Sequence, residues 1–93
     1  MKRTDENQRK IVAALRAVGA SVQDLSRVGK GCPDLLVGFR GRNYLLEVKN
    51  PERRWKLTDD QVMWHRYWNG KAVVVRDSEE ALAVITRPGQ DHD

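Results

Sequence analysis

Two apolar runs separated by a short turn constrain the fold of this chain more than any other feature. The runs LLVGF and YLLEV lie within residues 31–51, and GRN stands between them. A short glycine-containing turn between two such runs is typical of a β-hairpin. Yet Asp34 opens the first strand, and Glu47 and Lys49 lie at the end of the second. Three charged side chains therefore occupy strands that should belong to the core.

The length and charge of the chain limit its organisation and suggest its partner. Ninety-three residues support one hydrophobic core, so residues 1–93 are predicted to form a single domain, with a loose tail from about residue 88. The sequence is 40% hydrophobic and 32% charged, which favours a compact globular protein over a disordered one. A net charge of +4 points to an anionic partner, with nucleic acid as the first candidate.

Cysteine usage and hydropathy predict a soluble cytoplasmic protein. Cys32 is the one cysteine and has no partner for an internal disulfide, which favours a reducing compartment. No stretch approaches the roughly 20 apolar residues of a membrane span. The first ten residues, MKRTDENQRK, lack the apolar core of a signal peptide.

The order of elements is predicted as helix, three strands, helix, strand, helix. The strands are expected at SVQDLSR, DLLVGF, NYLLEVK and KAVVVRD. The first helix is expected to begin at Thr4 or Asp5 and to end before Gly19. Thr58 should begin a second helix that runs to about Trp68, and Ser78 should cap the last. This order predicts an α/β fold, with a small mixed sheet flanked by helices.

The hairpin should bring the three charges of the opening stretch together. Side chains alternate along a strand, so Glu47 and Lys49 share a face, and the turn places Asp34 beside them. Two adjacent carboxylates repel each other unless a cation lies between them. Mg²⁺ is commonly held by one or two carboxylates, and the carbonyl of Val48 could complete the set. Lys49 would then orient or deprotonate water, or neutralise charge in the transition state of phosphodiester hydrolysis.

A structural explanation of the same charges stays open at this point. Glu47 and Lys49 could form an ion pair on an edge strand, and Asp34 could follow Pro33 simply because Pro-Asp favours turns. Apolar residues flank Glu47 on both sides, however, and an unpaired buried charge is costly.

These motifs resemble the PD-(D/E)XK nuclease superfamily and, within it, the VRR-NUC (virus-type replication-repair nuclease) family. The resemblance rests on Pro33-Asp34, Glu47-Val48-Lys49, Leu57-Thr58 with Gln61, and Val73-Val74-Val75-Arg76 before a capped helix. It implies a restriction-endonuclease-like fold, Asp34 and Glu47 as metal ligands, Lys49 as a catalytic residue, and a Mg²⁺ or Mn²⁺ requirement. Stand-alone phage and bacterial members of this size are similar to Holliday-junction resolvases and tend to be homodimers.

Three amides are further candidates for the site. Gln61 lies on the same helical face as two tryptophans, and the family has a glutamine at this position near the active centre, which favours a site role. The alternative is a capping box, Thr58-x-x-Gln61. In the first helix the family often carries a metal-linked glutamate, but Glu6 lies opposite the apolar stripe and should face solvent. Gln8 and Asn7 are the possible site contacts there, which leaves open whether one metal or two is bound.

Basic residues surround the motif in sequence and predict phosphate contacts. They flank the strand that carries Glu47, and a tryptophan among them could stack on an unpaired base or wedge at a branch. The predicted DNA-binding residues are Lys30, Arg40, Arg42, Arg53, Arg54, Trp55 and Lys56.

The sequence therefore predicts a metal-dependent DNA endonuclease that acts on branched DNA. A non-catalytic DNA-binding module on a nuclease-like fold is the alternative, and a small structural domain with ion-paired charges is a third.

Overall fold

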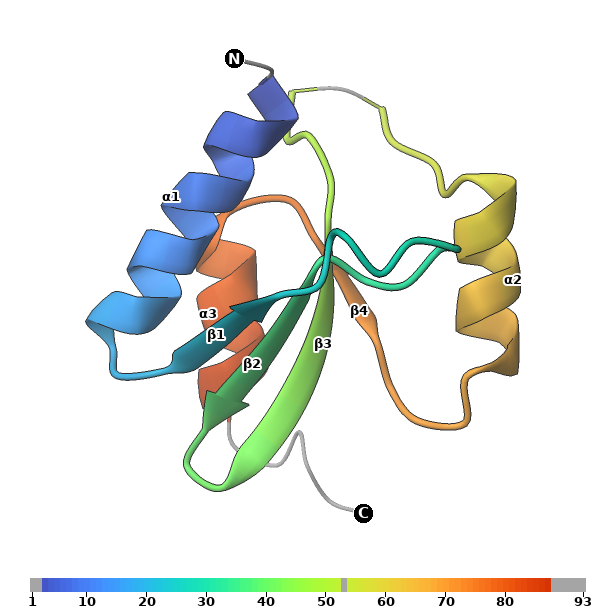
Figure 1. The fold of residues 1–93 in the computed structure, drawn as a ribbon. Coiled ribbons are helices and arrows are strands. Elements are labelled where there is room, and N and C mark those ends of the chain that lie inside the picture. The colour runs from blue at the N-terminus through green and yellow to red at the C-terminus, as the bar shows by residue number, and fades with distance from the viewer. Residues whose placement is uncertain (1–2, 53, 88–93) are drawn as a thin grey trace.

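The predicted order of elements is confirmed by the structure, a computed structural model that describes residues 3–52 and 54–87. The predicted tail at residues 88–93 lies outside this range. The elements are α1 (Arg3–Ala17), β1 (Ser21–Asp24), β2 (Leu35–Phe39), β3 (Arg42–Val48), α2 (Asp59–Tyr67), β4 (Val73–Val75) and α3 (Ser78–Thr86) (Figure 1). None of the helices within the described residues is long and apolar enough to cross a membrane.

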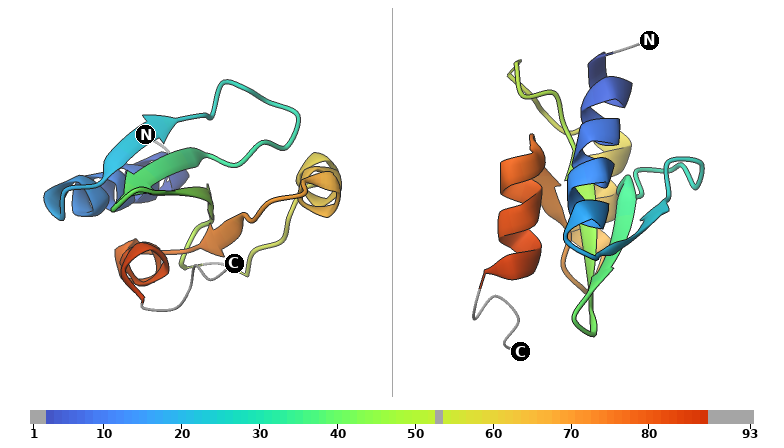
Figure 2. Two further views of the ribbon diagram at one scale, coloured as in Figure 1. Left: turned by 90° about the horizontal axis from the view of Figure 1, so that it is seen from below. Right: turned by 90° about the vertical axis from the view of Figure 1, so that its left-hand side faces the viewer.

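A mixed sheet with strand order β1-β2-β3-β4 forms the middle layer. The first three strands are antiparallel, and β4 pairs with β3 in parallel after the crossover through α2. Helices α1 and α3 lie on one face of the sheet, and α2 lies on the other side (Figure 2). The mixed sheet flanked by helices confirms the predicted fold class.

The turn between β2 and β3 fixes which residues face each other across the hairpin. Arg40 and Gly41 form the turn, with φ angles of 52° and 81°. Two successive residues with positive φ are typical of the tight turns that suit the twist of a hairpin. In the resulting register Phe39 pairs with Arg42 and Leu35 pairs with Leu46. Asp34 therefore lies at the level of Glu47, as the alternation of the sequence predicts.

The core lies between the sheet and the α1–α3 layer. Leu35, Val37, Leu46, Val48 and Val75 point from the sheet toward Ile11 and Leu15 of α1 and toward Ala81 and Ile85 of α3. The predicted stop at Gly19 is confirmed: its φ is +94°, and the amides of Gly19 and Ala20 donate to the carbonyls of Arg16 and Leu15. Val18, which the apolar stripe places in the core, is 45% exposed because the helix has already ended at Ala17.

The helix starts confirm one sequence prediction and correct two. Thr58 caps α2, as predicted. Asp77, not Ser78, caps α3, because the Asp77 carboxylate accepts from the amide of Glu80 at 2.8 Å and Ser78 is already helical. In α1, Thr4 and Asp5 lie inside the first turn, since the helix begins at Arg3.

Helix α2 contains no buried residue, so its position depends on a small number of contacts. One contact is made by Gly31, in the loop between β1 and β2. A β-carbon at Gly31 would overlap the carbonyl of Asp60 and lie 2.8 Å from the amide nitrogen of Gln61. The absence of a side chain at Gly31 therefore sets how closely the first turn of α2 approaches the sheet.

We expect Gly31→Ala to destabilise the protein more than Gly29→Ala. Both glycines have a positive φ, of +82° and +79°, so alanine carries a similar backbone penalty of roughly 1–2 kcal/mol at either position. No atom lies within 4 Å of a β-carbon at Gly29, whereas Gly31 would meet α2. Urea denaturation of the two variants measures the difference. Equal losses of stability would show that the Gly31 contact does not hold α2.

Candidate active site

The carboxylate of Glu47 lies at the centre of a cluster of polar groups. Glu47 is only 2% exposed, although its side chain can carry a charge. One oxygen, Oε2, accepts a hydrogen bond from Gln61 Nε2 at 2.9 Å and lies 3.7 Å from Lys49 Nζ. The other oxygen, Oε1, is buried and has no hydrogen-bond donor within the described residues. The site therefore leaves half of this carboxylate unsatisfied, which is unusual for a buried polar group.

Asp34 immediately precedes β2 and is held beside Glu47 by two hydrogen bonds. Its Oδ2 accepts from the amide of Val48 at 2.8 Å, and its carbonyl accepts from the amide of Leu25 at 2.8 Å. The strand register and these two bonds aim the Asp34 carboxylate at the end of β3, where Glu47 lies. The structure therefore brings together Asp34, Glu47 and Val48, the three residues that the sequence assigns to a metal.

Burial and charge make Glu47 difficult to ionise. Burial, followed by the negative charge of Asp34 and a hydrogen bond shared with it, raises the pKa of Glu47 to about 8, while Lys49 opposes the shift. A carboxyl group with this pKa is mostly protonated at neutral pH when nothing else is bound. A cation beside Oε1 would restore the ionised form.

Lys49 and Gln61 complete the cluster from two different elements. Lys49 Nζ donates to Gln61 Oε1 at 2.8 Å, and the same oxygen accepts from the amide of Thr58 at 2.9 Å. Gln61 thus forms the capping box of α2 and also reaches Glu47 and Lys49 through the two ends of its amide. The two roles considered for Gln61 in the sequence do not exclude each other.

The two amides of the first helix lie in different surroundings. Asn7 Nδ2 donates to the carbonyl of Lys49 at 3.0 Å and to that of Arg76 at 2.8 Å, so it ties α1 to the ends of two parallel strands. Gln8 Nε2 lies 3.5 Å from Asp24 Oδ2 and lines a groove that also contains Asp34. Glu6 is exposed, as predicted.

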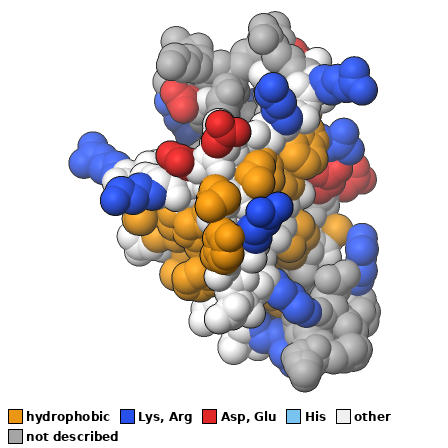
Figure 3. Space-filling model, turned by 90° about the vertical axis from the view of Figure 1, so that its right-hand side faces the viewer, with side chains coloured by type: hydrophobic (Ala, Val, Ile, Leu, Met, Phe, Trp, Pro, Cys, Tyr) orange, Lys and Arg blue, Asp and Glu red, His pale blue; other side chains and the backbone are white. Residues whose placement is uncertain are grey.

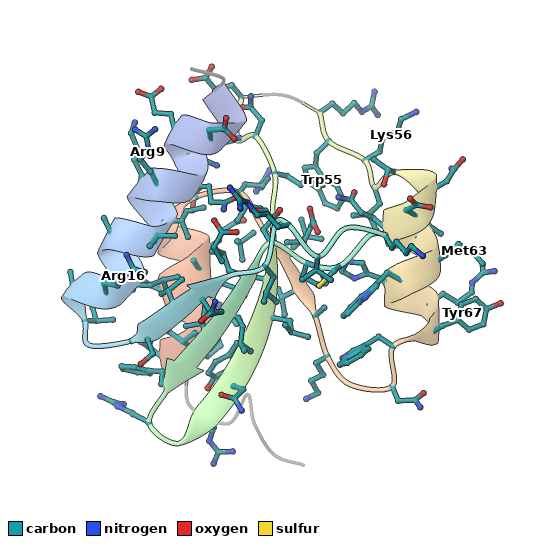
Figure 4. The ribbon with its side chains drawn as sticks, in the orientation of Figure 1. Arg9, Arg16, Trp55, Lys56, Met63 and Tyr67 are labelled. Atoms are coloured by element: carbon teal, nitrogen blue, oxygen red, sulfur yellow. The ribbon has the colours of Figure 1, made fainter. Side chains whose placement is uncertain are left out.

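The predicted DNA-binding residues are divided between two ends of the molecule. Arg54, Trp55 and Lys56 are exposed on the loop between β3 and α2. Figure 4 shows Trp55 and Lys56 on this loop. Lys30 is exposed in the loop that precedes Asp34. Arg40 and Arg42 lie at the hairpin turn, and at about 3.3 Å per residue this is roughly 17 Å along β3 from Glu47. Only one of the two loops that flank β3 in sequence therefore lies at the site. Arg53 lies outside the described residues.

Two residues near the site, Asp24 and Cys32, were not assigned a role from the sequence. Asp24, at the end of β1, accepts from the amide of Ser26 at 2.7 Å and from its hydroxyl, and these bonds lower the pKa of Asp24. Burial and the charges of Glu47 and Asp34 raise the pKa of the Cys32 thiol, so it stays protonated and is a poor nucleophile. Asp24 is the last residue of a short strand and Cys32 lies in a loop, and only tertiary structure shows that they lie near Asp34.

His65 lies on α2, and its side chain is half-buried. Its Nε2 is buried and has no hydrogen-bond partner within the described part of the chain. Burial and the charge of Lys49 lower the pKa of His65, which keeps it neutral.

A divalent cation fits the donor set at the end of β3. The unsatisfied Oε1 of Glu47 and the adjacent Asp34 carboxylate are hard oxygen donors of the kind that Mg²⁺ and Mn²⁺ take. No group of three or more His, Cys, Asp and Glu side chains suited to a metal occurs in the part of the chain that the structure describes. This excludes an all-side-chain cage there, but it agrees with two carboxylates supplemented by a backbone carbonyl and water.

Comparison with solved structures identifies the fold. A structure described as a VRR_NUC domain superimposes with a TM-score of 0.74 and 27% sequence identity, over 95% of this chain and 99% of that one. This match supports the assignment of the chain to the VRR-NUC family. No profile of a known protein family matches the sequence, and no curated protein is significantly similar to it. VRR-NUC domains are nuclease domains, so nucleic acid, and DNA in particular, is the implied partner.

The raised pKa of Glu47 predicts how stability changes with pH in the absence of metal. The folded state favours protonated Glu47, so this stabilisation is complete below the unfolded pKa of 4.5 and is lost as the pH rises through about 8. Urea denaturation in a chelator should therefore give decreasing stability between pH 7 and pH 8, where His65 is neutral and the Cys32 thiol is protonated. Glu47→Gln should be flat over this range. An unchanged slope in Glu47→Gln would contradict the assignment.

Proposed function

We propose that this chain is a metal-dependent DNA endonuclease that hydrolyses phosphodiester bonds in branched DNA, in the manner of a Holliday-junction resolvase. The observation that carries the proposal is the buried Glu47 carboxylate, which lies beside Asp34 and has one oxygen without a donor. A protein that only binds DNA has no need for two adjacent carboxylates next to phosphates, which they repel. With a cation, the same arrangement attracts a phosphate and leaves Lys49 beside it.

Asp34, Glu47 and the carbonyl of Val48 are the proposed ligands of Mg²⁺ or Mn²⁺. The cation, when bound, supplies Lewis-acid stabilisation of the negative charge that develops on the phosphate. Lys49 adds a second positive charge and orients the attacking water. Gln61 holds Lys49 Nζ at 2.8 Å and Glu47 Oε2 at 2.9 Å, so it is proposed to fix the distance between the lysine and the acid.

DNA is proposed to approach across the loops at the end of β3. Lys30, Arg54 and Lys56 are exposed there and can contact phosphates on either side of the scissile one. Trp55 is 40% exposed on the same loop and is proposed to stack on a base at a branch point. Arg40 and Arg42 can contact the same DNA only if it extends along the hairpin toward its turn.

The outer face of α2 is proposed to join two copies of the chain. Val62, Met63 and Tyr67 are all more than 40% exposed, and Figures 3 and 4 show hydrophobic side chains on this side with Met63 and Tyr67 pointing outward. The helix is acidic in its first turn and basic in its last, so two antiparallel copies would pair opposite charges about a two-fold axis. A symmetric dimer supplies the two active sites that a four-way junction requires.

Sedimentation analysis tests this interface. Met63→Glu should convert a dimer to a monomer, whereas Val28→Glu, which also replaces an exposed apolar residue, should leave the dimer intact. A monomeric wild-type protein would contradict the proposed interface.

Cleavage of DNA should depend on the three charged residues of the site. Four-way junctions, flaps, single strands and duplexes, each with and without Mn²⁺, would be compared on one gel. Wild-type protein should cleave branched DNA only with metal. Asp34→Ala, Glu47→Ala and Lys49→Ala should each lower the rate by about a hundredfold or more while DNA binding is retained. Unchanged cleavage by Glu47→Ala would overturn the proposed function, and tight binding without cleavage by wild type would favour the non-catalytic alternative.

The two roles of Gln61 can be separated with a matched pair of variants. Thr58→Ala removes the hydroxyl that accepts from Gln61 N but leaves the Gln61 side chain in the site. Gln61→Met removes both roles at nearly constant volume. Each variant should lose about 1 kcal/mol of stability through the cap. Only Gln61→Met should also lower the cleavage rate, by about tenfold or more, as expected for a residue that orients catalytic groups. Equal cleavage rates for the two variants would show that Gln61 caps α2 and has no role in catalysis.

A further inference from the structure

A groove between α1 and β1 opens beside Asp34, and its lining includes neither Lys49 nor Gln61. It has a volume of about 630 Å³, within the range of about 300–1,000 Å³ typical of small-molecule sites. Val12 and Ala13 of α1 and Val22 of β1 form an apolar wall. Gln8, Asp24 and Ser26 line it together with Asp34.

The groove is continuous with the candidate active site because of the strand register. Val22 pairs with Val37 and Asp24 with Leu35, so the groove runs along β1 toward the start of β2. Asp34 is the residue that precedes Leu35, and the Leu25 amide is bonded to its carbonyl. A DNA strand with its scissile phosphate at Asp34 would therefore have an adjacent nucleotide within reach of the groove.

We propose that this groove binds the base of an unpaired nucleotide that lies next to the cleaved phosphodiester. The inference rests on the proposed nuclease function and specifies what the substrate must present there. An unpaired base exposes its Watson–Crick edge, and such edges are read by side-chain carboxylates, amides and hydroxyls. Flaps and frayed pairs at a branch point supply unpaired nucleotides, whereas intact duplex does not.

The charges of the groove favour a base over a phosphate. Asp5, Asp24 and Asp34 line it together with two arginines, Arg9 and Arg16. A phosphate would meet an excess of carboxylates. An exocyclic amine of a base would instead find acceptors, and its ring would contact the apolar wall.

The polar end of the groove is already arranged for such a contact. The amide and hydroxyl of Ser26 both donate to Asp24 Oδ1, which fixes the orientation of that carboxylate. Its other oxygen, Oδ2, faces Gln8 Nε2 across the groove at 3.5 Å. This separation is long for a hydrogen bond, so a base amine can replace the contact at little cost.

Filling the groove should test the proposal without disturbing the active site. Ala13→Leu adds bulk to the wall, and Ala17→Leu, also exposed on α1 but outside the groove, is the matched control. Leucine and alanine are both good helix formers, so neither variant should unfold the helix. Gln8→Ala removes one polar contact. The probe is a fluorescent single-stranded oligonucleotide, compared with a copy in which every base is replaced by an abasic residue.

Fluorescence anisotropy would measure the affinity of each protein for the two oligonucleotides. Wild-type protein and Ala17→Leu should bind the base-bearing strand about tenfold more tightly than the abasic strand. Ala13→Leu and Gln8→Ala should reduce this preference while affinity for the abasic strand stays constant. Equal affinity of Ala13→Leu and wild type for the base-bearing strand would overturn the proposal. So would a loss that is the same for both strands, because it would place backbone phosphate in the groove.

Cleavage assays connect the groove to the active site. Two branched substrates would each carry one abasic residue, on one side or the other of the mapped cleavage position. Wild-type protein should cut only one of the two more slowly than the unmodified substrate. Ala13→Leu should abolish this difference in rate. If wild-type protein cuts no DNA at all, the proposed function fails, while the anisotropy comparison still decides whether the groove binds bases.

Discussion

The site depends on one unfavourable arrangement, a glutamate buried on a core strand beside a second carboxylate. Glu47 is 2% exposed, its pKa is raised to about 8, and one of its oxygens has no donor among the described residues. Such a group costs free energy unless something compensates it. Lys49 and Gln61 compensate one oxygen only. The other oxygen, Oε1, has no hydrogen-bond donor among the described residues, and the carboxylate lies beside Asp34. This uncompensated negative charge is the physical reason for expecting a divalent cation.

The rest of the fold serves to hold this arrangement in place. The two-residue turn at Arg40-Gly41 sets the register that brings Asp34 to the level of Glu47. Asn7 ties the end of β3 to α1, and Gly31 allows α2 to approach closely enough for Gln61 to reach both Glu47 and Lys49. Because α2 has no buried residue, the network around Gln61 is also part of what keeps this helix on the sheet.

Local patterns in the sequence predict much of the fold and the centre of the site. Strand alternation and the hairpin turn place Asp34, Glu47 and Lys49 together, and the Thr58-x-x-Gln61 spacing gives the start of α2. Features that depend on tertiary contacts are not predictable in this way. Sequence proximity suggested that Arg40 and Arg42 flank the site, but a strand has two ends and only one of them holds Glu47. Asp77 and Ser78 are both good capping residues, so one-residue errors at a helix start are expected. The contact of Gly31 with α2 and the groove beside Asp24 become visible only when the layers are assembled.

The most direct test of the central claim is calorimetric titration of Mn²⁺ into the protein at pH 7, repeated in buffers with different ionisation enthalpies. Because metal ligands must be deprotonated and Glu47 has a pKa of about 8, binding should release about one proton per Mn²⁺. Glu47→Gln should lose both the tight binding and the proton release. Failure of the wild-type protein to bind Mn²⁺, or binding without proton release, would contradict the claim that this carboxylate is held ready for a metal.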